Sequence, residues 1–141
     1  MELNVHDVSD LDEFLSTYGD CPTYTLSTVL IDAENVTSLV GLEGLTAVTG
    51  ELEIFGTGLT NLDGLQNLTS ISEKLEIYNN HNLLNVDFLN NLVYVGGKFD
   101  LVHNDIISNI DGFSSLSYVG GDFFILMNDN LSNINGLSSL S

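Results

Sequence analysis

From Val29 onward the sequence repeats itself with a period of 23 or 24 residues. An apolar residue opens a short strand-like segment at each step of this period. These first strand positions are Val29, Leu52, Leu75, Phe99 and Phe123. Leucine-rich repeats have periods of about 20–29 residues. Because a coil of this size buries its apolar side chains only by stacking on its neighbours, the period predicts a solenoid.

Each repeat begins with a pattern typical of a strand and continues with a pattern typical of turns. Leu75 and Ile77 alternate with polar residues, which predicts a strand with one buried face. Apolar residues then follow at intervals of three, at Leu83, Val86, Leu89, Leu92 and Val95. A helix has similar spacing, but the Gly, Asn and Ser residues in these segments disfavour a long one. We therefore predict a mainly β fold, a right-handed β-solenoid of about five coils.

Polar residues also recur in register. Asn80, Asn104 and Asn128 share one position of the repeat, and Thr57 replaces them in the shorter second coil. An inward Asn at this position is expected to bond backbone groups of adjacent coils that would otherwise be buried without partners. A second set marks another corner of the coil and consists of Asn61, Asn85, Asn109 and Asn133.

The first 22 residues lie outside the repeat and are expected to form a helical cap, followed by repeats over 23–141 in a single domain. Ser9 is the predicted N-cap of the helix and Gly19 its C-terminal stop. An apolar stripe of Leu11, Phe14 and Leu15 is expected to cover the open end of the first coil. Cys21, the one cysteine, is expected to be a small buried residue between cap and coil. The last repeat lacks a polar cap, so we expect the natural protein to continue beyond Ser141.

Two stretches resemble a known family. The segments GLTNLDGLQNLTSISEKLEIYNN and NLVYVGGKFDLVHND are similar to the receptor L-domain repeats of cell-surface proteins. That family includes the ligand-binding lobes of the insulin and epidermal growth factor receptors and many microbial surface proteins, and the microbial branch is the closer match. The resemblance covers roughly residues 21–141. It implies a leucine-rich-repeat-like solenoid, a role in ligand binding, adhesion or the cell wall, and an extracellular or cell-surface location.

The net charge of the chain disfavours some classes of binding partner. Twenty acidic residues stand against two lysines, with no arginine, for a net charge of -18. A nucleic-acid-binding protein needs Lys and Arg to neutralise phosphates, and anionic membrane surfaces are disfavoured for the same reason. The acidity indicates high solubility or adaptation to a salty medium. Alternatively, it indicates that the protein binds a cation or a basic partner.

Candidate binding residues lie at the outward positions of the predicted strands, where side chains alternate with the buried ones. One outward row, Glu51, Lys74, Lys98 and Asp122, lies beside the two rows that contain the candidates. The next row is Glu53, Glu76, Asp100 and Phe124, and the third is Phe55, Tyr78, Val102 and Leu126. Apolar side chains are unusual on a solvent face, so the third row predicts a surface that binds a protein or a glycan. Self-association, or packing under a flanking segment, would also explain it.

Other functions have weaker support. The row of Asp63, Asp87 and Asp111 raises the question of calcium, but no acidic loop motif accompanies it. His6, His81 and His103 lack the spacing of metal ligands, and no catalytic arrangement is evident. No apolar run is long enough to span a membrane. We therefore expect a non-enzymatic recognition or adhesion module without cofactors; the alternative is a structural spacer that assembles or continues into further repeats.

Overall fold

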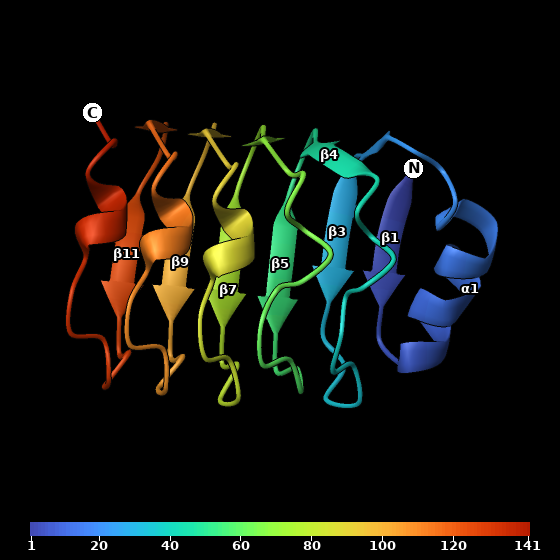
Figure 1. Cartoon of the computed structure of the whole chain (residues 1–141), viewed down its shortest axis with the longest axis horizontal. Coiled ribbons are helices and arrows are strands. Elements are labelled where there is room, and N and C mark those ends of the chain that lie inside the picture. Colours follow the sequence, from blue (N-terminus) through green and yellow to red (C-terminus); the bar gives the residue numbers. More distant parts are fainter.

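The computed structural model describes residues 1–141 and shows the coils stacked along the long axis of the molecule (Figure 1). Six parallel strands form the main sheet, in the order β1-β3-β5-β7-β9-β11. They are β1 (Glu2–Val5), β3 (Thr28–Ile31), β5 (Leu52–Phe55), β7 (Leu75–Tyr78), β9 (Phe99–Val102) and β11 (Phe123–Leu126). Leu52 pairs with Leu75, and Leu75 with Phe99, as the period predicts. The predicted mainly β solenoid is confirmed.

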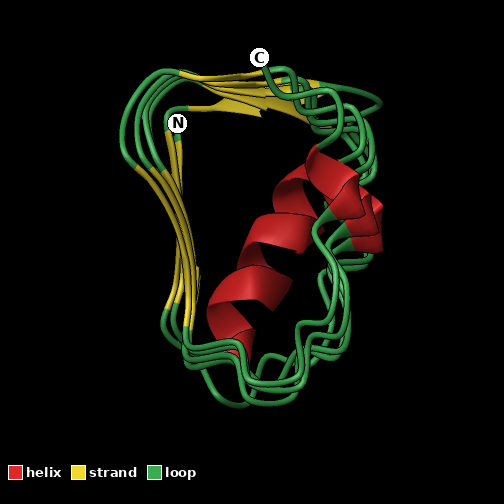
Figure 2. Ribbon diagram, turned by 90° about the vertical axis from the view of Figure 1, so that its left-hand side faces the viewer, coloured by secondary structure: helices red, strands yellow, loops and turns green.

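A second parallel sheet forms another wall of the coils, in the order β10-β8-β6-β4-β2. Its strands are β2 (Tyr24–Leu26), β4 (Leu45–Val48), β6 (Ser70–Ile71), β8 (Tyr94–Val95) and β10 (Tyr118–Val119). Three short 3-10 helices lie in the later coils, at η1 (Asp87–Leu89), η2 (Asp111–Phe113) and η3 (Asn135–Leu137). Seen end-on, the two sheets, the 3-10 helices and the connecting turns enclose the interior (Figure 2).

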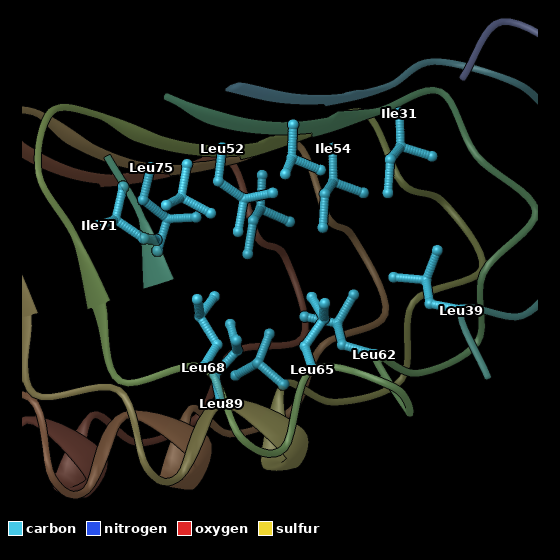
Figure 3. Packing of buried hydrophobic residues seen from close by; sticks show 14 of the residues in the cluster. Ile31, Leu39, Leu52, Ile54, Leu62, Leu65, Leu68, Ile71, Leu75 and Leu89 are labelled. Carbon is cyan, nitrogen blue, oxygen red and sulfur yellow. The ribbon is translucent and has the colours of Figure 1, made fainter. Parts of the chain in front are cut away.

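The interior is filled by columns of aliphatic side chains from successive coils. Figure 3 shows Leu52, Ile54 and Leu75 of the main sheet directed toward Leu62 and Leu65 of the opposite wall. These five residues belong to one cluster of 33 buried hydrophobic residues. Burial of each such side chain stabilises the fold by about 1.5–3 kcal/mol. Since the contacts run between coils, the stabilisation requires stacking.

The first Asn set forms the predicted ladder. Asn80 and Asn104 are fully buried, and the backbone N–H of Asn80 donates to the Asn104 side chain. Asn104 Nδ2 in turn donates to the carbonyl of Ile77 in the preceding coil, at 2.9 Å. Asn128 accepts from the backbone N–H of Asn104 in the same manner. The second set acts within each coil instead, since Asn109 Oδ1 accepts from the backbone N–H two residues later.

The N-terminal segment contains more structure than the predicted cap. Strand β1 pairs in parallel with β3, which adds a sixth strand that the repeat pattern does not reveal. Helix α1 (Val8–Tyr18) follows and lies across the end of the coils (Figures 1 and 2). Leu11 and Phe14 are buried and Leu15 packs against the core, as the apolar stripe predicts.

Two details of the cap differ from the prediction. The N-cap residue is Asp7, not Ser9, because Asp7 and Asp10 form a capping box. The Asp7 side chain accepts from the backbone N–H of Asp10, and the Asp10 side chain accepts from the backbone N–H of Asp7. Cys21 is half-buried where full burial was expected. Gly19 ends the helix as predicted, although in a right-handed conformation.

The Asp7 cap makes helix α1 sensitive to acid. The Ser9 backbone N–H, and then the Ser9 hydroxyl and Asn35 amide, lower the pKa of the Asp7 carboxyl below its ordinary 3.8. A lowered folded-state pKa gives stability that is present above the unfolded value and is lost as pH falls through the folded one. We expect Asp7→Ala to be less stable than the wild type at pH 7, with the difference shrinking below about pH 4.

Urea unfolding at neutral and acid pH measures this difference. Asp12→Ala is the matched control, because it removes a charge from the same helix and Asp12 is exposed. A stability difference for Asp7→Ala that stayed constant with pH would show that its carboxylate does not cap the helix.

Candidate functional site: the solvent face of the main sheet

The structure brings all eight predicted binding residues onto one face of the main sheet. We call Glu53, Glu76 and Asp100 the acidic row, since Glu53 pairs with Glu76 and Glu76 with Asp100. Phe124 continues this row on β11. The apolar stripe beside it consists of Phe55, Tyr78, Val102 and Leu126, which are paired in that order across β5, β7, β9 and β11.

Both lysines of the chain lie over the acidic row. Lys74 Nζ is 2.6 Å from Glu53 and 3.2 Å from both Glu51 and Glu76. The hydrogen bond with Glu53 is the main reason why the pKa of Lys74 is raised. Lys98 bridges Glu76 and Asp100, and its bond with Asp100 is the main reason why its own pKa is raised.

These ion pairs leave a net negative charge on this part of the face, because four carboxylates share the two ammonium groups of the lysines. The carboxylates are those of Glu51, Glu53, Glu76 and Asp100. One carboxylate oxygen, Oδ1 of Asp100, is covered by its neighbours and has no hydrogen-bond donor. An acceptor left without a partner in a desolvated position costs about 1–3 kcal/mol. The acidic row therefore holds an acceptor that the chain's own side chains do not satisfy.

The apolar stripe is more covered on β5 and β7 than on β11. The rings of Phe55 and Tyr78 stack with centroids 4.7 Å apart and planes 6° from parallel, and both residues are half-buried. Burial, followed by the charges of Glu53 and Glu76, raises the pKa of Tyr78, so its phenol is neutral at physiological pH. On β11, Leu126 is 50% exposed and Phe124 is 41% exposed.

An open hollow of about 360 Å³ lies on this face. Four of the predicted residues line it together with two that the sequence analysis missed. The lining residues are Glu76, Tyr78, Asp100 and Val102, with Asn79 and His103 in addition. Asn79 and His103 have φ angles of 57° and 55°, a left-handed conformation that glycine adopts easily. Gly56 stands at the equivalent position of the second coil, which is the signal that could have located this turn.

Other surfaces of the molecule also carry aromatic or acidic side chains. Tyr94 and Tyr118, on β8 and β10, are exposed and stack with centroids 5.1 Å apart. The Tyr-Val-Gly-Gly sequence that recurs around them could have indicated this pair. Asp87 and Asp111 line a second shallow hollow beside the 3-10 helices. No group of three or more His, Cys, Asp or Glu side chains lies close enough together to hold a metal ion.

The fold and the site define a parallel β-solenoid that presents an open face, mixed in charge and apolar character, as its most distinctive surface. The Receptor L domain family model matches residues 46–109, so the resemblance predicted from the sequence is confirmed for the central coils. Receptor L domains are non-enzymatic, ligand-binding and typically extracellular modules. No curated protein and no solved structure matches the chain. None of its helices is long and apolar enough to cross a membrane.

Proposed function

We propose that this chain is a recognition module that binds a protein ligand at the cell surface through the solvent face of its main sheet. The observation that carries the proposal is the apolar stripe, which is in register across four strands and adjoins the hollow. Contiguous apolar side chains on a solvent-facing sheet are typical of interaction surfaces. The match to a family of ligand-binding modules supports the same function.

The exposed end of the stripe gives the most direct test. Phe124→Ser combined with Leu126→Ser removes apolar surface from this face, while both side chains are too exposed to contribute much to folding. Tyr94→Ser combined with Tyr118→Ser is the control, because it removes a similarly exposed apolar pair from the other sheet. Each immobilised protein is incubated with an extracellular extract of the source cells, and the retained proteins are quantified by mass spectrometry.

We expect the wild type and the control to retain at least one protein in common. The variant with Phe124→Ser and Leu126→Ser, which we call the face variant, should retain about tenfold less of it, or less still, and a tenfold loss corresponds to about 1.4 kcal/mol. Equal retention by all three proteins contradicts the proposal. Loss of retention only in the variant with Tyr94→Ser and Tyr118→Ser would place the binding surface on the second sheet.

A second candidate function, assembly, is favoured by the state of the last strand. Phe123 and Ile125 of β11 are half-buried, whereas Phe99 and Leu101 in the preceding coil are fully buried. Strand β11 is outermost in the order of the main sheet, and an outermost strand can pair with a further strand, from another copy or from a further repeat. Sedimentation velocity from micromolar to millimolar concentration distinguishes the two: growth with concentration supports assembly, and a constant monomer contradicts it.

A further inference from the structure

The hollow lies where the row of stacked rings ends. Phe55 covers one face of the Tyr78 ring, and the residue paired with Tyr78 on the other side is Val102. A valine side chain is too short to continue the stack. The space that a third ring would fill is therefore open, and Tyr78 and Val102 both line it.

The walls of this space carry negative charge. Glu76 and Asp100 line the hollow beside Tyr78. Lys98 is engaged by both carboxylates, and Lys74 by Glu76 and two further glutamates. A group that fits here is flat on the side that meets the ring and positively charged on the side that meets the carboxylates.

We propose that the hollow binds an arginine side chain of the protein ligand, with its guanidinium stacked on the free face of Tyr78 and paired with Asp100 and Glu76. The inference rests on the proposed function, because it assigns the partner chemistry of the same face. A guanidinium is planar, stacks on aromatic rings and donates hydrogen bonds in its own plane. The net charge of -18 also attracts a basic partner over long range.

Two other ligand chemistries fit less well. A lysine ammonium pairs with carboxylates but lacks the flat surface that continues a ring stack. A neutral glycan donates hydroxyl hydrogens to carboxylates, yet gains nothing from the negative field of the protein.

The test uses three short synthetic peptides, Ac-Gly-Val-X-Val-Gly-NH2, in which X is arginine, lysine or the neutral isostere citrulline. Each is titrated into the ¹⁵N-labelled protein, followed by amide chemical shifts. We expect the arginine peptide to cause saturable shifts at Tyr78, Asp100, Val102 and His103, with a Kd of about 1 mM. The lysine peptide is expected to bind about threefold more weakly and the citrulline peptide about tenfold more weakly.

Two matched pairs of variants make the assignment specific. Val102→Phe continues the ring stack and fills the hollow, so it should abolish the shifts at Tyr78 and Asp100, whereas Leu126→Phe lengthens the same row outside the hollow. Asp100→Asn should weaken binding about tenfold. Asp111→Asn, the control, removes the same charge at the first residue of η2, and the equivalent first residue of η3 is Asn135.

Shifts scattered over the acidic surface, with equal responses to Asp100→Asn and Asp111→Asn, would overturn the inference in favour of general charge attraction. Absence of any arginine-peptide binding at the hollow would overturn it as well. A parallel titration with chitobiose that produced saturable shifts at the hollow would assign it to a glycan instead. None of these outcomes alters retention by the face variant, so failure of the inference is distinguishable from failure of the proposed function.

Discussion

Phe99→Ala is expected to lower the free energy of unfolding by about 3–5 kcal/mol. Phe99 is fully buried at the first position of β9, where it stacks on Phe123 with centroids 4.6 Å apart. It also meets the edge of Phe113, with the two planes at 78°. The substitution therefore removes a large apolar side chain and two aromatic contacts at once, and the rigid stacked coils leave little freedom to close the cavity.

Urea unfolding followed by circular dichroism measures the loss, with Phe123→Ala as the control. Phe123 makes the same ring contact with Phe99 but lies half-buried in the last coil, so its truncation should cost less than half as much. Equal losses for the two variants would show that the last coil is as well packed as the interior ones, which contradicts the arrangement described above.

Asn104→Ala is expected to cost about 3 kcal/mol, because the substitution removes three hydrogen bonds to the backbone and leaves the buried N–H of Asn80 without the acceptor that Asn104 provides. The Asn104 side chain accepts from the backbone N–H of Asn80 and donates to the carbonyls of Ile77 and Val102. A methyl group can replace none of these bonds. Because the bonds with Asn80 and Ile77 join neighbouring coils, their loss should destabilise the stack and not only the local turn.

Asn109→Ala separates this effect from the general loss of an asparagine. Asn109 lies in the same coil, but its side chain accepts only from the Asp111 backbone N–H in a partly exposed turn. We expect this control to lose less than about 1 kcal/mol. Comparable losses for the two variants would contradict the distinction between a ladder that joins coils and a turn that stabilises one coil.

The repeat period predicted the register of the main sheet because every coil uses its side chains in the same way. Once Leu52, Leu75 and Phe99 are aligned, strand alternation assigns the acidic row and the apolar stripe to the outer face. The period carried no information about β1, because helix α1 follows this strand in place of the usual coil. With only one four-residue strand and no repeated turn, residues 2–5 could not be aligned with the repeats.

The chemistry of the site was harder to predict than its residues. Sequence alone placed Tyr78 and Val102 in one row, but the hollow between them depends on how the ring of Tyr78 stacks on Phe55. The unsatisfied Asp100 oxygen likewise depends on how two lysines are shared among the carboxylates. The choice of Asp7 over Ser9 as the N-cap required the reciprocal bond from Asp10. Each of these features is a side-chain arrangement, which a periodic pattern does not encode.

In-register stacking of the coils is the claim on which both proposals depend, and nuclear Overhauser effects test it directly. The Leu75 backbone N–H donates to the carbonyl of Lys98, which in a parallel sheet places the Leu75 amide proton beside the α-proton of Phe99. We predict a strong cross-peak between these two protons in a ¹⁵N-edited spectrum. A cross-peak from Leu75 to the α-proton of Asp100 instead would displace the register by one residue, turn the acidic row inward and contradict the binding face.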